Sequence, residues 1–231
     1  MDWLNHIWEK IDAAFLAEDR WMLYVKGLGV TMEVAVTAGI IGIILGTIVA
    51  FMKLSTTKRG KPTIFTHIAN IYIDIIRGTP SVLQLLIMWF GVFASCKNGI
   101  LVACLTFGIN SGAYVAEIVR SGIMSIDKGQ MEAGRSLGLS AGKTMQLIII
   151  PQAFKNVLPA LINEMIVLLK ETAIIGYIGT TDLTKAATLV QSRTYSAYVP
   201  LLTAALFYWL LVSILTFFMG KVERRMRKND R

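Results

Sequence analysis

The first long apolar run of this chain, residues 28–52, reads LGVTMEVAVTAGIIGIILGTIVAFM. A helix needs about 20 such residues to cross a hydrocarbon core of roughly 30 Å, so this run can span a membrane with some tilt. The whole chain is similarly apolar, with 231 residues of which 55% are hydrophobic and 16% charged, and with a mean hydropathy of +0.59. This composition excludes an ordinary soluble domain and predicts an all-α membrane protein.

Further apolar segments raise the predicted number of transmembrane helices to five. The region 64–93 is interrupted by polar residues around Arg77 and Pro80, which divides it. Residues 64–76 are predicted to form an interfacial or partly inserted helix. Pro80 is predicted to lie in the first turn of the second membrane span, where its missing N–H costs nothing. A later span is predicted to have Pro159 near its start. The five predicted spans cover about residues 28–52, 80–93, 100–123, 157–178 and 198–219, within a transmembrane domain of residues 21–220.

Residues 1–20 differ from the rest in pattern. Apolar side chains that include Trp3, Trp8 and Phe15 recur there at helical spacing, which predicts an amphipathic helix lying in the membrane interface. Acidic residues such as Asp2 and Glu9 stand where a secretory signal peptide needs basic ones, so this segment is not predicted to be a signal peptide.

The distribution of basic residues predicts the orientation. The net charge is +8, and Lys and Arg concentrate in the loop after the first span, in the loop of residues 124–152 and in the tail of residues 221–231. Five spans place these three segments on one side, whereas the loop between spans two and three has only Lys97 as a basic residue. Because cytoplasmic loops carry the excess of Lys and Arg, the N-terminus is predicted outside and the C-terminus in the cytoplasm. Since no basic patch is interleaved with aromatic residues, nucleic-acid binding is not expected.

One of these basic loops carries a recognisable motif in residues 130–151. Glu132 and Ala133 are followed by Gly138 and by a closing Ile148 and Pro151, in the order and spacing of the "EAA" loop. The segment resembles this loop of ABC-importer permeases, which is the docking element for the ATP-hydrolysing subunit. Gly134 stands for the second Ala of the motif and Ile150 for its Leu. The residues predicted to dock the ATPase are Glu132, Ala133, Gly134, Arg135 and Gly138.

Three further motifs resemble the polar amino-acid subfamily of these permeases. They are the sequence RGTP at residues 77–80 with Gln84 one turn onward, the run NSGAYVAE at residues 110–117, and NE at residues 163–164 followed by KET at residues 170–172. The resemblance covers about residues 20–220. It implies an importer built from two permease subunits, identical or homologous, two ATP-binding subunits and an extracytoplasmic substrate-binding protein, in the cell membrane of a prokaryote.

The polar residues of these motifs suggest a substrate path even when the family resemblance is set aside. Polar and ionisable groups within a membrane are costly and usually mark a pathway or a paired interior site. Asn110, Ser111, Tyr114 and Glu117 fall on one face of the third span. An amino acid needs acceptors for its ammonium group and donors for its carboxylate. The residues predicted to bind substrate are Gln84, Asn110, Ser111, Tyr114, Glu117, Asn163 and Glu164.

Each of these side chains also has a structural interpretation. Asn110, Ser111 and Gly112 suit helix packing as well as ligand binding, because small and polar residues are typical of helix contacts in lipid. Glu117 could pair with Arg120, which lies three residues further on. Arg77 is predicted to be structural, pairing with Asp74, and not a ligand group.

The chain lacks the G-x-x-x-x-G-K-[ST] motif of an ATPase, so it is predicted to be no enzyme, and ATP and Mg are expected on partner subunits. Its two cysteines, Cys96 and Cys104, and its two histidines, His6 and His67, have no metal-site spacing. An ion-gradient-driven transporter, with Glu117 and Glu164 as ion sites, is the alternative function, although such folds usually show internal repeats. A membrane-embedded enzyme or scaffold has no support in the residue inventory. The sequence leaves the transported amino acid open, with a lean towards basic or dipolar ones.

Overall fold

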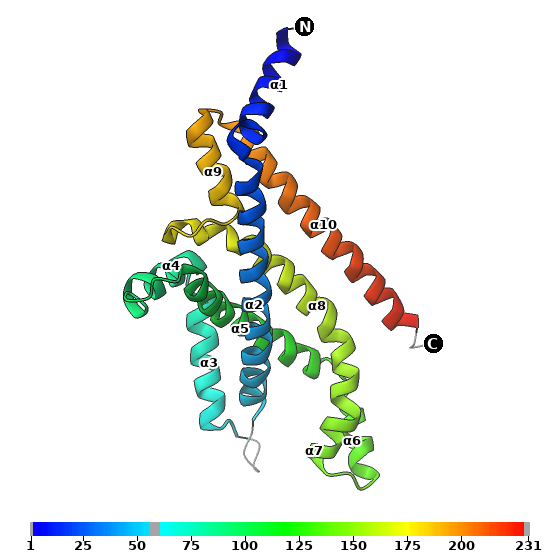
Figure 1. The fold of residues 1–231 in the computed structure, drawn as a ribbon. Coiled ribbons are helices and arrows are strands. Elements are labelled where there is room, and N and C mark those ends of the chain that lie inside the picture. The colour runs from blue at the N-terminus through cyan, green and yellow to red at the C-terminus, as the bar shows by residue number, and fades with distance from the viewer. Residues whose placement is uncertain (1, 56–60, 229–231) are drawn as a thin grey trace. The chain divides into compact units, whose positions relative to one another are not determined.

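The computed structural model describes the backbone of residues 2–55 and 61–228, and the side chains of residues 8–55, 61–221 and 223–225. Within these ranges the chain is helical without a β-strand, which confirms the all-α prediction (Figure 1). The α-helices are α1 (Asp2–Phe15), α2 (Trp21–Leu54), α3 (Ile64–Arg77), α4 (Ser81–Ile87), α5 (Gly99–Met124), α6 (Lys128–Ser136), α7 (Ala141–Thr144), α8 (Ile150–Glu171), α9 (Leu183–Thr194) and α10 (Tyr198–Lys228). Short turns of 3₁₀-helix, η1 (Ala17–Asp19) and η4 (Thr172–Ile178), and of π-helix, η2 (Met88–Val92) and η3 (Met145–Ile149), connect some of them.

Three described helices are long and apolar enough to cross a membrane, in the segments Ala17–Leu54, Gly99–Met124 and Tyr198–Arg225. A fourth candidate is a bent pair, α3 with the segment Ser81–Val92, whose axes differ by 102°. The predicted break before Pro80 is confirmed, but the prediction that residues 80–93 form a span by themselves is wrong. The 12 residues of Ser81–Val92 are too short, since a helix rises about 1.5 Å per residue and the hydrocarbon core is about 30 Å thick.

Helix α8 corrects the predicted fourth span of residues 157–178. The helix begins at Ile150, and Pro159 therefore lies in its interior instead of near its start. It ends at Glu171, after which η4 continues as 3₁₀-helix. At 22 residues α8 is long enough to cross a membrane, but it is not among the segments apolar enough to qualify.

The two ends of the chain also differ from the predicted boundaries. The N-terminal helix stops at Phe15, and the chain is kinked at Glu18 and Asp19, whose φ angles of 55° and 53° lie in the left-handed region. At the other end, the tail predicted from residue 221 continues α10 without a break to Lys228. The interfacial position of α1 remains a prediction.

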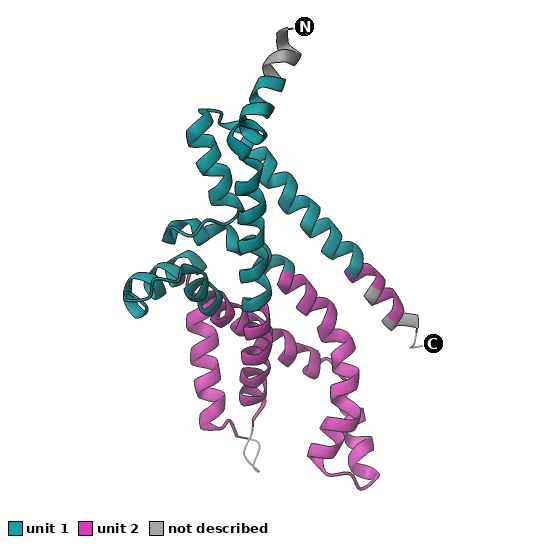
Figure 2. Cartoon of the chain, viewed as in Figure 1, with its two compact units in different colours: residues 1–38, 81–106, 166–218 teal, residues 39–80, 107–165, 219–231 magenta. Residues whose placement is uncertain are grey.

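The chain divides into two compact units, coloured separately in Figure 2. Unit 1 comprises residues 1–38, 81–106 and 166–218. Its core is formed where α1 and the first part of α2 pack with α9 and α10, around the buried residues Ala14, Tyr24, Leu183, Ala187, Val190 and Ala204. The Thr31 hydroxyl accepts a hydrogen bond from the backbone N–H of Leu183 at 3.2 Å, which fixes the start of α9 to α2.

Unit 2 comprises residues 39–80, 107–165 and 219–231, and in it α2, α3 and α5 form one core. Helices α2 and α5 approach closely because small residues face each other. A Cβ atom on Gly46 would lie 2.7 Å from the backbone oxygen of Gly112. Ser111, Ala113 and Ala116 on the same helix are buried. The packing interpretation of this small-residue face is thereby confirmed, as expected for helix contacts that depend on close backbone approach.

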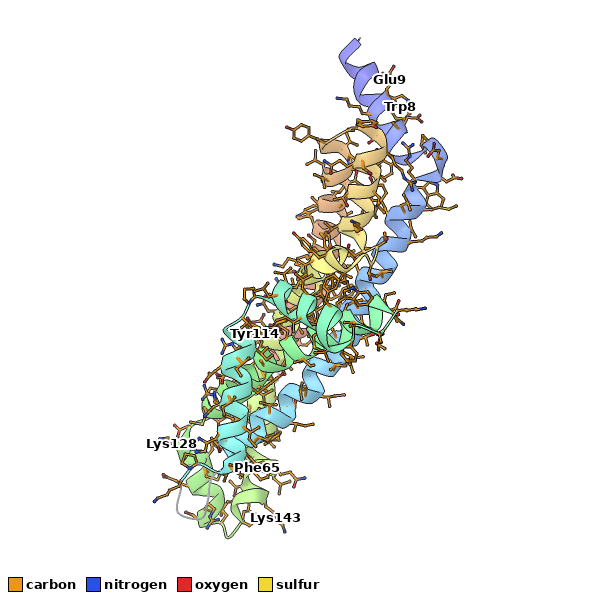
Figure 3. All side chains as sticks on the ribbon, turned by 90° about the vertical axis from the view of Figure 1, so that its left-hand side faces the viewer. Trp8, Glu9, Phe65, Tyr114, Lys128 and Lys143 are labelled. Atoms are coloured by element: carbon orange, nitrogen blue, oxygen red, sulfur yellow. The ribbon has the colours of Figure 1, made fainter. Side chains whose placement is uncertain are left out.

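A second core in unit 2 joins the end of α5 to the loop elements α6 and η3 and to the start of α8. Its buried centre is formed by Ile123, Ile149 and Ala153. Lys128 of α6 and Lys143 of α7 lie at the same end of this unit as Phe65 at the start of α3, as Figure 3 shows. The basic loop elements and the beginning of α3 therefore share one end of unit 2.

Candidate functional site

The EAA-like loop folds as a short helix closed by a glycine. Helix α6 begins at its N-cap Asp127, whose carboxylate accepts a hydrogen bond from the Gly129 N–H at 2.6 Å. At the other end, the Gly138 N–H donates to Arg135 and the Leu139 N–H to Gly134. This hydrogen-bond pattern requires a left-handed residue after the helix, and Gly138 has a φ of +83°. Glycine is favoured there because it carries no Cβ to clash.

The side chains of this loop divide between an outer and an inner face. Glu132, Ala133, Arg135 and Gly138 are exposed, in keeping with their predicted docking role. Gly134 instead is buried, and a Cβ atom on it would lie 2.5 Å from Cγ2 of Thr144. The small size of Gly134 therefore serves the packing of α6 on α7, and its docking role stays a prediction.

One further residue on the outer face, Leu137, was not predicted from the motif. Leu137 follows α6 and is 81% exposed. It adjoins Arg135 and Gly138, so it adds an apolar side chain to the predicted docking surface. Its position at the C-cap, between Arg135 and Gly138, was the available signal.

Unit 2 also contains a pocket of about 420 Å³ lined by α3, α5 and α8. The volume falls in the range of small-molecule sites, about 300–1,000 Å³. Its charged lining residues are Arg77 from α3, Glu117 from α5 and Glu164 from α8. The other lining residues are Tyr114, Ile118, Ser121, Gly122, Ser125, Asn156 and Ala160.

Arg77, predicted to be structural and paired with Asp74, lines this pocket. Its guanidinium carbon lies over the ring of Tyr114, 5.1 Å from the ring centroid, which is a cation–π contact. Arg77 and Asp74 do not form an ion pair in the described part of the chain. The face of the Tyr114 ring thus holds the Arg77 guanidinium at the pocket wall. The N–H groups at the edge of the guanidinium stay able to bind a carboxylate.

Glu117 is paired with two cations. Its Oε1 accepts a hydrogen bond from the Lys53 ammonium of α2, and its Oε2 lies 2.9 Å from the Arg120 guanidinium. The expected pair with Arg120 is confirmed, whereas Lys53 was interpreted only as part of the basic loop that orients the chain. Lys53 reaches back because it lies in the last turn of α2, next to the middle of α5.

Glu164 is held by a neighbouring helix. The hydroxyl of Ser111 donates a hydrogen bond to its Oε1 at 3.0 Å, and this hydroxyl is fully buried on α5. Asn110 is also buried, with 4% of its surface exposed. The predicted face of the third span is therefore real: Tyr114 and Glu117 line the pocket, and Ser111 supports the acid opposite.

Two predicted substrate residues are not part of this pocket. Asn163 is exposed on α8, although its neighbour Glu164 is a lining residue. Gln84 is half-buried on α4, which belongs to unit 1, so the pocket formed by unit 2 does not contain it. Their assignment as ligands rests on the motif alone.

Comparison with known proteins gives the family of the chain. Residues 40–228 match the family described as binding-protein-dependent transport system inner membrane component. The chain belongs to this family. It is the permease component of an ABC importer, in which separate subunits hydrolyse ATP.

Individual relatives agree with this assignment along nearly the whole permease. It is 43% identical over 208 residues to an arginine transport system permease protein of Bacillus subtilis, covering 89% of this chain and 93% of that one. It is 33% identical over 209 residues to a glutamine transport system permease protein of Escherichia coli K12, covering 89% and 93%.

Solved structures have the same fold. A crystal structure of an amino acid ABC transporter with histidines superposes with a TM-score of 0.82 at 40% identity, covering 91% of this permease and 98% of that chain. The methionine ABC transporter in inward-facing conformations gives a TM-score of 0.77 at 19% identity, covering 90% and 98%, and shows the shared fold alone.

Proposed function

We propose that this permease imports polar amino acids and that the pocket of unit 2 binds them during translocation. The observation that carries the proposal is the pairing of opposite charges in one pocket, with Arg77 on α3 and Glu164 on α8. A free amino acid presents a carboxylate and an ammonium group, and burying each is costly unless a partner is supplied. The named relatives that transport arginine and glutamine support the same substrate class.

The roles of the two charged residues follow from their hydrogen-bonding capacity. A guanidinium donates in a planar fork that matches a carboxylate, so Arg77 is assigned to the substrate carboxylate. Glu164 accepts hydrogen bonds when ionised and is assigned to the substrate ammonium, with Ser111 fixing its rotamer. The substrate side chain then extends along the wall that includes Asn156 and Ser121.

The proposed membrane arrangement has five crossings, with the bent pair of α3 and Ser81–Val92 counted as one of them. The others are α2, α5, α8 and α10. This count keeps the N-terminus outside and the EAA-like loop in the cytoplasm, as the basic residues predict. The position of Lys128 and Lys143 at the same end of unit 2 as Phe65 supports it, because both basic loops then face the same side.

In this arrangement the partners are a second permease subunit, two ATP-binding subunits that carry ATP and Mg, and an extracytoplasmic binding protein, in the cell membrane of a prokaryote. ATP binding drives transport only by favouring one of two permease conformations, since a ligand that binds both equally shifts nothing. The exposed face of α6 with Leu137 is the element on which the ATPase acts.

The substrate assignment is tested by uptake into proteoliposomes that contain the full importer. We expect ATP-dependent uptake of labelled arginine or glutamine that persists when ionophores collapse the ion gradients. Arg77→Gln and Glu164→Gln should each lower uptake about tenfold or more, since each removes the charged partner of one substrate group. Glu9→Gln, at an exposed acid of α1, is the matched control. Uptake that needs an ion gradient and not ATP would instead support the gradient-driven transporter.

The docking surface has a separate test. Leu137→Asp places a charge at the exposed apolar contact and should abolish co-purification of the ATPase with the permease, together with amino-acid-stimulated ATP hydrolysis. Ser95→Asp adds the same charge at an exposed residue before α5 and should preserve both. Intact co-purification of the Leu137→Asp complex would show that this face is not the docking site.

A further inference from the structure

The pairing of Glu117 has a consequence for substrate selection. Both of its carboxylate oxygens are engaged, Oε1 by Lys53 and Oε2 by Arg120, whose Nε lies 3.0 Å from that oxygen. The side chains of Lys53, Glu117 and Arg120 are 22%, 17% and 32% exposed, so the cluster is largely shielded from water. Such an interaction is screened less than a surface ion pair.

The cluster forms part of the pocket and is not a remote contact. Glu117 is a lining residue, as are Tyr114 and Ile118 on the same helix. Lys53 and Arg120 are not lining residues, so they bind the acid from outside the pocket. A carboxylate that lines a cavity, but whose two oxygens are bound by cations outside it, offers little attraction to a cationic ligand.

We propose that Lys53 is a specificity-determining residue: by pairing with Glu117 it withholds that carboxylate from the substrate and limits the preference of the pocket for amino acids with cationic side chains. Lys53 does not touch the substrate and acts through Glu117. This inference rests on the proposed function, because it assumes that the pocket binds an amino acid.

The position of Lys53 explains why this residue can have such an effect. It lies in the last turn of α2, whereas Glu117 and Arg120 belong to one helix, α5, where they are three residues apart. The ion pair of Glu117 with Arg120 lies within α5 and does not depend on the position of α2. The second cation depends on the packing of α2 against α3 and α5, around Ala50, Ile73 and Ala116.

The experiment measures equilibrium binding of labelled lysine and glutamine to the purified permease–ATPase complex in lipid nanodiscs, without the binding protein. Omitting the binding protein removes its own selectivity from the measurement. The readout is the ratio of the lysine affinity to the glutamine affinity. We expect Lys53→Gln to raise this ratio about five- to tenfold, because a carboxylate that has lost one of its cations attracts the lysine ammonium.

Matched variants separate specificity from stability. The double variant Lys53→Gln with Glu117→Gln also removes the carboxylate that the loss of Lys53 releases. It should return the ratio to within about twofold of the wild type. Lys53→Arg keeps the charge and should leave the ratio unchanged. Lys26→Gln makes the same substitution at an exposed lysine of the same helix and should have no effect.

Other outcomes would overturn the inference. If Lys53→Gln lowers both affinities equally, Lys53 only fastens α2 to α5. If that complex does not assemble, Arg120→Gln releases the same acid from its second cation, and an unchanged ratio there rejects the proposal. Failure of the proposed function looks different, because the wild-type complex would then bind neither amino acid.

Discussion

At residue 27 the chain has no room for a Cβ atom. One added there would lie 2.6 Å from the backbone oxygen of Asp182 and 2.8 Å from its carbonyl carbon. Backbone atoms cannot rotate away as a flexible side chain can, so the contact between α2 and the start of α9 requires glycine. Nearby, Thr31 accepts the hydrogen bond from Leu183, and together these residues fix that turn.

Gly27→Ala is therefore expected to destabilise unit 1 by about 1–3 kcal/mol, the usual cost of overpacking a tight contact. Thermal unfolding of the purified permease in detergent measures the effect. Gly29→Ala is the control, since nothing lies within 4 Å of its Cβ position. Equal melting temperatures for the two variants would show that the turn at Asp182 moves freely.

Asp182 is a fully buried carboxylate, and its burial disfavours the charged form. It caps α9 by accepting hydrogen bonds from the N–H groups of Thr184 and Lys185, each at 3.0 Å. Burial nevertheless raises the pKa of this carboxyl above its ordinary value of 3.8, because desolvation outweighs the hydrogen bonds that favour the charged form. A raised pKa means that the folded state holds a proton more tightly than the unfolded chain.

The sign of the pH dependence follows from this shift. The contribution of Asp182 to stability is fully present below pH 3.8 and is lost as the pH rises through the higher pKa of the folded state. Asp182→Asn keeps an oxygen acceptor for the cap without a charge, so it should be at least as stable as the wild type at pH 7. Asp182→Ala loses the cap and should cost about 1 kcal/mol. Melting temperatures at pH 5 and pH 7 test both, and a less stable Asn variant at pH 7 contradicts the argument.

Among the elements, α6 and α7 depend on one close contact. Gly134 on α6 faces Cγ2 of Thr144 at the end of α7, and the Thr144 hydroxyl donates to the Ser140 backbone oxygen at 3.0 Å. The β-branched threonine cannot turn its methyl group away without losing this hydrogen bond. The EAA-like loop thus keeps its shape through contacts on its inner face, while its outer face is exposed.

Gly134→Ala is expected to loosen the docking loop and to reduce the coupling of ATP hydrolysis to uptake, by about two- to fivefold for a strain on the order of 1 kcal/mol. Adding Thr144→Ser should restore the coupling, since serine keeps the hydroxyl and lacks Cγ2. Gly142→Ala on α7 is the control, because its Cβ position is open. A double variant no better than Gly134→Ala would place the strain elsewhere. The measurement is substrate imported per ATP hydrolysed in proteoliposomes.

For the whole molecule, the orientation is the property that labelling can decide. In a cysteine-free background, Ser95→Cys lies in an exposed loop before α5 and Lys143→Cys on exposed α7. We expect a membrane-impermeant thiol reagent to label residue 95 in intact cells, and residue 143 only after the membrane is opened. Leu215→Cys, within the apolar α10, is the control that stays unlabelled in both preparations. Labelling of residue 143 from outside would reverse the proposed topology.

Individual residues show what sequence patterns can predict about a site. The spacing of Ser111, Tyr114 and Glu117 placed them on one helix face. In the structure Tyr114 and Glu117 line one pocket, and Ser111 donates a hydrogen bond to a further lining residue. A periodic pattern succeeds here because the geometry within one helix depends only on the spacing of its residues. The contacts of Arg77 and Lys53 were not predicted, because their partners lie 37 and 64 residues away in the sequence.

The sequence by itself determined that this chain is an all-α membrane protein with an EAA-like loop, because apolar run length, glycine placement and motif spacing are local properties. It also set the breaks at Pro80 and Gly138, where the backbone has few alternatives. Only the tertiary structure decided that Gly134 faces inward, that Arg77 lies over Tyr114 and that Lys53 neutralises Glu117. These contacts depend on which helices pack side by side, and that choice is made by the summed packing of small residues along α2, α3 and α5.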